Sequence, residues 1–92
     1  MSKLTLGTVV VTARIDSAMS ESPAFHSEVA TALGKYSNLD WGDTCEEDCI
    51  TNNQALANNE RILAVYNTCK GKIWIITEWD RSVTTILFPD EY

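Results

Sequence analysis

Apolar, β-branched and aromatic residues gather in two runs near the end of the chain, at residues 72–79 and 82–88. A short polar stretch, Asp80 and Arg81, separates the two runs. Runs of this composition favour a pleated, half-buried surface, and a brief polar interruption is typical of a turn. We therefore expect a β-hairpin here, and we expect the rest of the chain to pack around it.

A third run with a period of two precedes the hairpin. Residues 61–68 (RILAVYNT) alternate in the manner of a strand, and a tight connection at residues 69–71 follows, in which Gly71 can adopt a positive φ. Pro89 ends the ladder because it lacks a backbone N–H. These three consecutive strands predict an antiparallel meander.

The beginning of the chain predicts one more strand. Residues 6–13 (LGTVVVTA) are apolar and β-branched, with Val9 and Val11 on one face and Val10 on the other. Residues 14–22 are more polar, and we expect them to form a connecting segment without regular structure.

A helix is predicted to start at Ser22 and Pro23 and to continue to about Tyr36. Ser caps orphan N–H groups, and Pro is tolerated at the first helical position because its missing N–H needs no partner there. Four apolar residues then recur at helical spacing and should face a core: Phe25, Val29, Leu33 and Tyr36.

A second helix should open with Thr44 and Glu47, which have the spacing of a capping box. It should continue to about Ala57, with Asn58 and Asn59 closing it. Four of its residues are expected to point at least partly inward: Cys49, Ile50, Asn53 and Leu56. In the loop before it, residues 37–43, we expect the ring of Trp41 to pack on the core with its N–H in water.

The order β-α-α-β-β-β indicates a single α+β domain over residues 1–92, with an antiparallel sheet and two helices on one face. No helix remains to cover the other face of the hairpin, where apolar side chains also occur. Either the sheet curls on itself with the first strand, or an apolar face meets a partner or a second copy of the chain. A homodimer is one of the open alternatives.

The formal net charge is −6, and the acidic residues are unevenly spread. Five of them lie within nine residues that contain no Lys or Arg: Asp40, Asp43, Glu46, Glu47 and Asp48. A field of this sign repels phosphate backbones and attracts basic surfaces. We expect no direct nucleic-acid binding. Three of these acids would also complement the dipole of the second helix.

No apolar run approaches the roughly 20 residues that span a bilayer, and residues 1–7 show neither a basic cluster nor an apolar signal core. Three cysteines are an odd number in a short chain, which favours reduced thiols. The sequence therefore predicts a cytoplasmic protein that contacts no membrane.

Several stretches resemble a family of small uncharacterised bacterial proteins found on plasmids, phages and other mobile elements. They are VVVT at residues 9–12, DWGD at 40–43, EED at 46–48, and the long terminal stretch IWIITEWDRSVTTILFPDEY at 73–92. The resemblance implies a compact accessory protein of a mobile element and carries no activity. Cys49 stands where the family pattern leads us to expect a basic residue.

Two sets of residues have the ligand types of a metal site. Cys45, Cys49, Cys69 and His26 would make a Cys3His zinc site if the fold gathered them, although their spacing matches no zinc-binding pattern. The second set is made of carboxylates that would suit Mg²⁺: Asp40, Asp43, Glu47, Asp48, Glu78 and Asp80. Solvated acids, a complemented helix dipole and plain thiols explain the same residues, so we expect no cofactor and no metal.

Arg81 has two interpretations. It would either form a polar recognition tip with its neighbours, or reach Asp43 or Asp80 and pin the loop at residues 40–43 to the turn. We favour the second interpretation. Exposure of Trp79 or Trp41 would favour an interface, because aromatic residues are typical interface anchors.

The leading functional hypothesis is a non-enzymatic, acidic protein that binds a host protein, as an inhibitor of a nucleic-acid-processing defence system of the restriction or CRISPR kind. The acidic run would then imitate DNA phosphates towards a basic groove. The residues expected to bind the partner are Asp40, Trp41, Asp43, Glu46, Glu47, Asp48, Glu78, Trp79, Asp80 and Arg81. The alternative is a small-molecule, nucleotide or metal module with a pocket between the 40–43 loop and the hairpin turn.

Overall fold

The computed structural model describes residues 4–92 and has the predicted α+β class. Residues 1–3, part of the stretch in which no signal segment was expected, lie outside the described residues. The elements are β1 (Thr8–Val11), α1 (Ala13–Glu21), α2 (Pro23–Ser37), α3 (Glu46–Asn58), β2 (Ile62–Thr68), β3 (Gly71–Thr77), β4 (Val83–Leu87) and a 3-10 turn (Pro89–Glu91).

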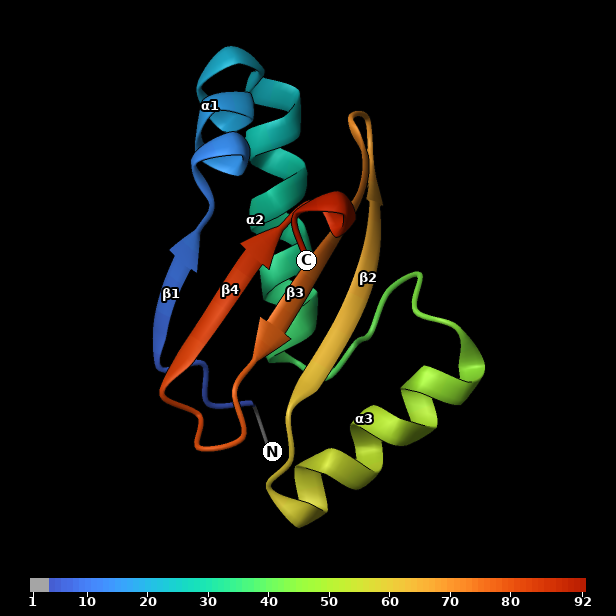
Figure 1. Ribbon diagram of the computed structural model, residues 1–92. Helices are drawn as coiled ribbons and strands as arrows, with labels where there is room; N and C mark the ends of the chain where they lie inside the picture. Colours follow the sequence, from blue (N-terminus) through green and yellow to red (C-terminus); the bar gives the residue numbers. More distant parts are fainter. Residues whose placement is uncertain (1–3) are drawn as a thin grey trace.

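The sheet has the strand order β1-β4-β3-β2 (Figure 1). The predicted antiparallel meander of β2, β3 and β4 is confirmed, with Ala64 opposite Ile75 and Ile75 opposite Ile86. The sheet is mixed and not wholly antiparallel, because β1 lies beside β4 in parallel with it. A parallel neighbour requires a long crossover, and here everything from α1 to β3 separates the two strands.

Helices cover one face of the sheet. α2 crosses behind the strands in Figure 1 with α1 beside it, whereas α3 lies next to the β2 edge. The expectation of two helices on one face is confirmed only in part: α2 covers the face, α1 packs beside it past the ends of β1 and β4, and α3, the second predicted helix, lies at the β2 edge. The opposite side of the sheet is called the outer face. Of the described residues 4–92, the C-terminal turn alone lies in front of the strands there, and Tyr92 packs edge-to-face on Trp74 with ring centroids 5.5 Å apart.

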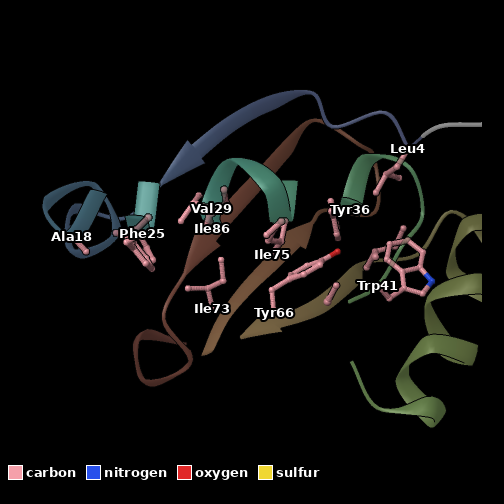
Figure 2. Close-up of a cluster of buried hydrophobic side chains, with 14 of the residues drawn as sticks. Leu4, Ala18, Phe25, Val29, Tyr36, Trp41, Tyr66, Ile73, Ile75 and Ile86 are labelled. Carbon is pink, nitrogen blue, oxygen red and sulfur yellow. The ribbon is translucent and has the colours of Figure 1, made fainter. Parts of the chain in front are cut away.

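The core lies between α2 and the sheet (Figure 2). Phe25, Val29 and Tyr36 are buried as expected from their helical spacing, and they face Ile75 and Ile86 of the central strands. Leu33, the fourth residue of the predicted stripe, is only partly buried at the margin of this core. Two rows of inward side chains thus meet as the sequence periodicity indicates.

The segment expected to be irregular between the first strand and α2 is helix α1. Thr12 caps it, since its hydroxyl accepts a hydrogen bond from the N–H of Ile15 at 3.3 Å. Ile15 and Ala18 are buried in it and Met19 is partly buried, so apolar residues recur at the i, i+3, i+4 spacing of a helix face, a signal that the sequence analysis missed. The helix is short and packs on α2 and β4, which stabilises it.

The N-cap of α3 lies one residue after Thr44, the N-cap of the predicted capping box. Cys45 is the N-cap and makes no side-chain cap hydrogen bond. The Thr44 hydroxyl instead donates to the carbonyl of Trp41 at 2.5 Å and accepts from the N–H of Val65 at 2.8 Å. The helix ends as predicted, with Asn59 in the left-handed conformation at φ 53°. The Thr44 hydroxyl thus bonds to β2 and does not cap the helix, although its spacing in the sequence indicates a cap.

The inward face of α3 also differs from the prediction. Its buried residues are Asn52 and Ala55, whereas Ile50 is 52% exposed and Asn53 is exposed. Cys49 and Leu56, also expected to point inward, are partly buried against the core. α3 is turned in this way because Asn52 pairs with the backbone of β2.

A chain of buried hydroxyl groups crosses the core. The Tyr36 and Thr77 hydroxyl oxygens lie 2.6 Å apart, Thr77 and Thr84 lie 2.8 Å apart, and Thr84 donates to the carbonyl of Leu6 at 2.7 Å. Because Leu6 offers only an acceptor, the donors run in one direction from Tyr36 to Leu6. The network ties the segment before β1 to α2 through the two central strands.

This network predicts loss of stability in alkali. Burial raises the pKa of Tyr36 to about 12, while an unfolded tyrosine has a pKa of about 10. Above pH 10 the unfolded chain therefore releases a proton that the folded chain keeps. Tyr36 should therefore not change the free energy of unfolding below pH 10, and it should lower that free energy by up to about 3 kcal/mol between pH 10 and 12.

Urea unfolding followed by circular dichroism from pH 8 to 12 measures this effect. Burial also raises the pKa of Tyr66, so some loss should persist in Tyr36→Phe, with a shallower slope. A wild-type stability that is unchanged between pH 10 and 12 would contradict the assignment of Tyr36 as a buried, neutral phenol.

Candidate functional site

The five acidic residues singled out in the sequence occupy the loop before α3 and the first turn of that helix. We call Asp40, Asp43, Glu46, Glu47 and Asp48 the acidic segment. All five are exposed. α3 holds three of them at its N-terminus, where a helix dipole stabilises negative charge. The structure therefore gathers this part of the predicted site on one side of the molecule, beyond β2.

Two members of the acidic segment also shape the loop. The Asp40 carboxylate accepts a hydrogen bond from the N–H of Gly42 at 3.0 Å, which closes a turn at φ 63° for Gly42. The Asp43 carboxylate accepts from the N–H of Asn67 at 2.9 Å. Asp40 therefore shapes the loop itself, whereas Asp43 holds the loop against β2.

The remaining acids, Glu46, Glu47 and Asp48, have solvent-facing carboxylates. The two ion pairs of the described residues join Arg14 to Asp90 at 2.8 Å and Arg61 to Glu78 at 3.9 Å, and neither reaches the acidic segment. Six of the 13 acidic residues lie in residues 36–60, which contain no Lys or Arg, and the other seven equal the seven Lys and Arg residues in number. The whole net charge of −6 thus belongs to this loop, α3 and Glu60, which follows α3.

Trp41 anchors the loop to the core. Its side chain is 6% exposed and packs edge-to-face on Tyr36, with ring centroids 5.6 Å apart. The expectation that its N–H stays in water was wrong, because the indole donates to the Asn53 side chain at 3.0 Å. Figure 2 shows the indole nitrogen on the side of α3. Trp41 is therefore a structural link between α2 and α3.

Arg81 at the β3–β4 turn pins that turn to the end of α3. Its guanidinium donates to the carbonyl of Ala55 at 3.1 Å and to that of Glu60 at 2.7 Å. It also donates to Glu78 in its own turn at 3.2 Å. A structural role for Arg81 was the favoured interpretation, but its partners are backbone carbonyls and not Asp43 or Asp80. Cations at a helix C-terminus are favoured by the dipole.

The other turn residues differ in exposure. Trp79 is 65% exposed, which is unusual for so large an apolar side chain. Asp80 accepts hydrogen bonds from the side chain and the N–H of Ser82, at 2.6 and 3.1 Å, and these bonds lower the pKa of its carboxyl. Glu78 is half-buried beside Arg61. Trp79 is the one member of the turn whose exposure favours an interface.

The structure does not bring the two halves of the predicted site together. Asp43 lies against Val65 and Asn67, whereas the β3–β4 turn starts next to Thr77, which is opposite Ile62. Along β2 these points are about 10 to 17 Å apart, at about 3.3 Å per residue. The acidic segment and Trp79 are therefore separate surfaces at opposite ends of α3.

A hollow of about 200 Å³ lies elsewhere, between α2 and the end of β2. It includes Glu28, Lys35 and Asp43 but no residue of the hairpin turn. It is smaller than the 300 to 1,000 Å³ that is typical of small-molecule sites. This hollow borders the 40–43 loop at Asp43 and is not the pocket predicted beside the hairpin turn, which stays a prediction.

The cysteines do not assemble with other ligands. No group of three or more His, Cys, Asp or Glu side chains within residues 4–92 is arranged to hold a metal ion. Burial raises the pKa of the Cys49 thiol, and a hydrogen bond with Glu28 raises that of Cys69. Raised pKa values disfavour the thiolate, which is the form that binds metals.

The β2 edge has a feature that the sequence reading missed. Both backbone groups of Leu63 and Val65, and the N–H of Asn67, are bonded to side chains or to the loop before α3. Asn52 donates to the carbonyl of Leu63 at 2.8 Å and accepts from its N–H at 3.2 Å. Thr44 accepts a hydrogen bond from the N–H of Val65, and Asp43 accepts one from the N–H of Asn67. We call Asp43, Thr44 and Asn52 the β2 edge cap.

Comparison with known proteins adds no further assignment: no protein family, characterised protein or solved structure matches the chain. In the part of the chain that the structure describes, no helix combines the length and apolar character needed to cross a membrane.

Proposed function

We propose that the protein acts by binding a basic surface of a host protein through the acidic segment. The observation that carries the proposal is the separation of charge, because the whole net charge of −6 lies in residues 36–60. Charge concentrated on one side of a small protein steers association with a surface of opposite sign. An inhibitor that occupies a phosphate-binding groove needs this distribution.

The class of partner follows from the same chemistry. A protein groove that binds DNA or RNA is lined by Lys and Arg, and carboxylates on a rigid helix can occupy the positions of phosphates. The resemblance to mobile-element proteins suggests why a bacterial host would meet such an inhibitor. We propose a nuclease or its complex in a restriction or CRISPR defence system as the partner, in the host cytoplasm.

Affinity capture from a lysate of the native host tests the proposal. The bait is the intact protein, and the eluates at about 50 mM and about 500 mM salt are identified by mass spectrometry. We expect one stoichiometric partner that is lost at high salt, because ions screen exposed charges within about 10 Å at 0.1 M salt. Duplex DNA added to the low-salt capture should release the same partner.

A matched pair of variants tests the role of the acidic segment. Glu46→Gln with Glu47→Gln and Asp16→Asn with Glu21→Gln each remove two negative charges, and each pair includes a residue of a first helical turn. Only the first pair should weaken capture, by about 3-fold to 10-fold, which corresponds to 0.3 to 0.7 kcal/mol for each charge. Equal weakening by both pairs would mean that only the total charge of the protein matters. Unchanged capture by the first pair would contradict binding through the acidic segment.

A further inference from the structure

The two edges of the sheet differ in whether their outward backbone groups have hydrogen-bond partners. The β2 edge is closed by the β2 edge cap, which bonds its alternate backbone groups. β1, at the other edge, has β4 as its one neighbour, and no described element lies beyond it in Figure 1. Its residues Thr8, Val9 and Val10 are exposed. An uncovered edge strand presents free N–H and C=O groups that can pair with another strand.

The direction of the free groups follows from the hydrogen bonds to β4. Thr8 donates to Ser82 at 3.0 Å and Thr12 donates to Ile86 at 3.1 Å. Backbone groups alternate in direction along a strand, so the groups of Val10 also face β4 and those of Val9 and Val11 face outward. The open edge therefore offers two residues with both backbone groups free, separated by Val10.

Apart from its short length of four residues, the edge lacks the devices that usually prevent pairing. β1 reads TVVV, with no charged residue, no Pro and no bulge. Val9 and Val10 are each 40% exposed on opposite faces of the strand. β-branched side chains on an uncharged edge favour strand addition.

We propose that β1 pairs with β1 of a second copy, antiparallel about a two-fold axis at Val10. Val9 of each copy then lies opposite Val11 of the other and exchanges both N–H···O bonds with it, which gives four new backbone hydrogen bonds. Val10 faces its own symmetry mate on the outer face as a close, non-hydrogen-bonded pair. The two sheets become one continuous sheet of eight strands.

Charge supports a second copy as the occupant. The acidic segment lies beyond β2, at the far side of the sheet from β1, so at least three strand spacings of about 4.8 Å separate it from the axis. In the dimer the two acidic segments occupy opposite ends and repel little. Pairing through β1 is thus compatible with a chain of net charge −6 and leaves both acidic segments free for a partner.

The pairing is short, so the dimer should be weak. Four residues of strand bury far less than the roughly 1,200 Å² of a stable interface. We expect monomer and dimer to exchange with a dissociation constant of about 0.1 to 1 mM. Sedimentation velocity of the full chain from about 10 µM to about 1 mM should show this shift.

Two variants and one residue-level measurement test the interface. Val10→Lys places like charges opposite each other at the axis and should weaken the dimer at least tenfold. Tyr92→Ser trims a side chain that is 64% exposed on the outer face and should leave the dimer unchanged. Amide exchange by NMR should show protection of Val9 and Val11 that rises with concentration, while Val10 is protected throughout.

Three results would overturn the proposal. They are a protein that stays monomeric at about 1 mM, a dimer that dissociates on Tyr92→Ser but not on Val10→Lys, and amides of Val9 and Val11 whose exchange is independent of concentration. The second result would place the contact on the outer face instead of the β1 edge.

Discussion

Replacing Gly7 by alanine should lower the free energy of unfolding by about 3 kcal/mol or more. Gly7 has φ 64°, a conformation that residues with a Cβ rarely adopt. A Cβ built on Gly7 would lie 2.4 Å from the carbonyl oxygens of Arg81 and Ser82. Both atoms belong to the backbone, so they cannot rotate away as a side chain could.

The consequence extends beyond the turn. The N–H of Thr8, the next residue, donates to the Ser82 carbonyl at 3.0 Å and starts the parallel pairing of β1 with β4. Displacing this carbonyl would loosen β1 together with the Leu6 carbonyl that ends the buried hydroxyl chain. We therefore expect the variant to lose β1 pairing before the rest of the sheet unfolds.

Gly34→Ala is the matched control. Gly34 lies in α2 with no atom within 4 Å of a built Cβ, so alanine should stabilise the protein by about 0.5 to 1 kcal/mol through helix propensity. Chemical denaturation of both variants measures the contrast. A Gly7→Ala protein as stable as wild type would show that the contact of Gly7 with the β3–β4 turn does not hold in solution.

Replacing Asn52 by alanine should lower the free energy of unfolding by about 2 to 4 kcal/mol, because it removes the hydrogen-bond partners of both the N–H and the carbonyl of Leu63. Asn52 is 3% exposed, and its amide bonds the N–H and the carbonyl of Leu63 at 3.2 and 2.8 Å. Without it, these two part-buried groups lose their side-chain partners. Unsatisfied buried groups carry the full cost of their lost hydration.

Two further variants separate this effect from helix propensity. Gln54→Ala lies on the exposed surface of the same helix and should change stability by less than about 0.5 kcal/mol. Asn52→Asp keeps an acceptor for the N–H of Leu63 but places a carboxylate oxygen against its carbonyl, so it should be at least as destabilising as alanine. If Asn52→Ala and Gln54→Ala unfold at the same denaturant concentration, the pairing with Leu63 contributes nothing.

The sequence by itself determined the elements whose signals are local. The period of two predicted β2, β3 and β4 and their meander, and the Ser22-Pro23 start with the Phe25, Val29 and Tyr36 spacing predicted α2. These elements are read correctly because side-chain periodicity and a short turn are properties of neighbouring residues. The acidic run was likewise visible in the sequence, since charge can be counted without a fold.

Only the tertiary structure decided how distant groups share hydrogen bonds. Thr44 has the spacing of a capping box, yet its hydroxyl accepts a hydrogen bond from the β2 edge. Asn52 bonds to β2 and therefore lies on the inner face of α3, while Ile50 faces solvent. Arg81 likewise finds carbonyls of α3 that no spacing indicates. A backbone group left unpaired by the sheet costs more than a local cap contributes, so the edge takes these side chains.

The placement of β1 follows the same rule. Its sequence indicates a strand but contains nothing that selects a neighbour or a direction, because both edges of a meander offer equivalent backbone groups. The β2 edge is occupied by side chains and the loop, so β4 is the free partner, and the chain enters parallel to it. Local composition thus set the elements and the charge of this protein, and long-range backbone pairing set which edge is closed and which is open.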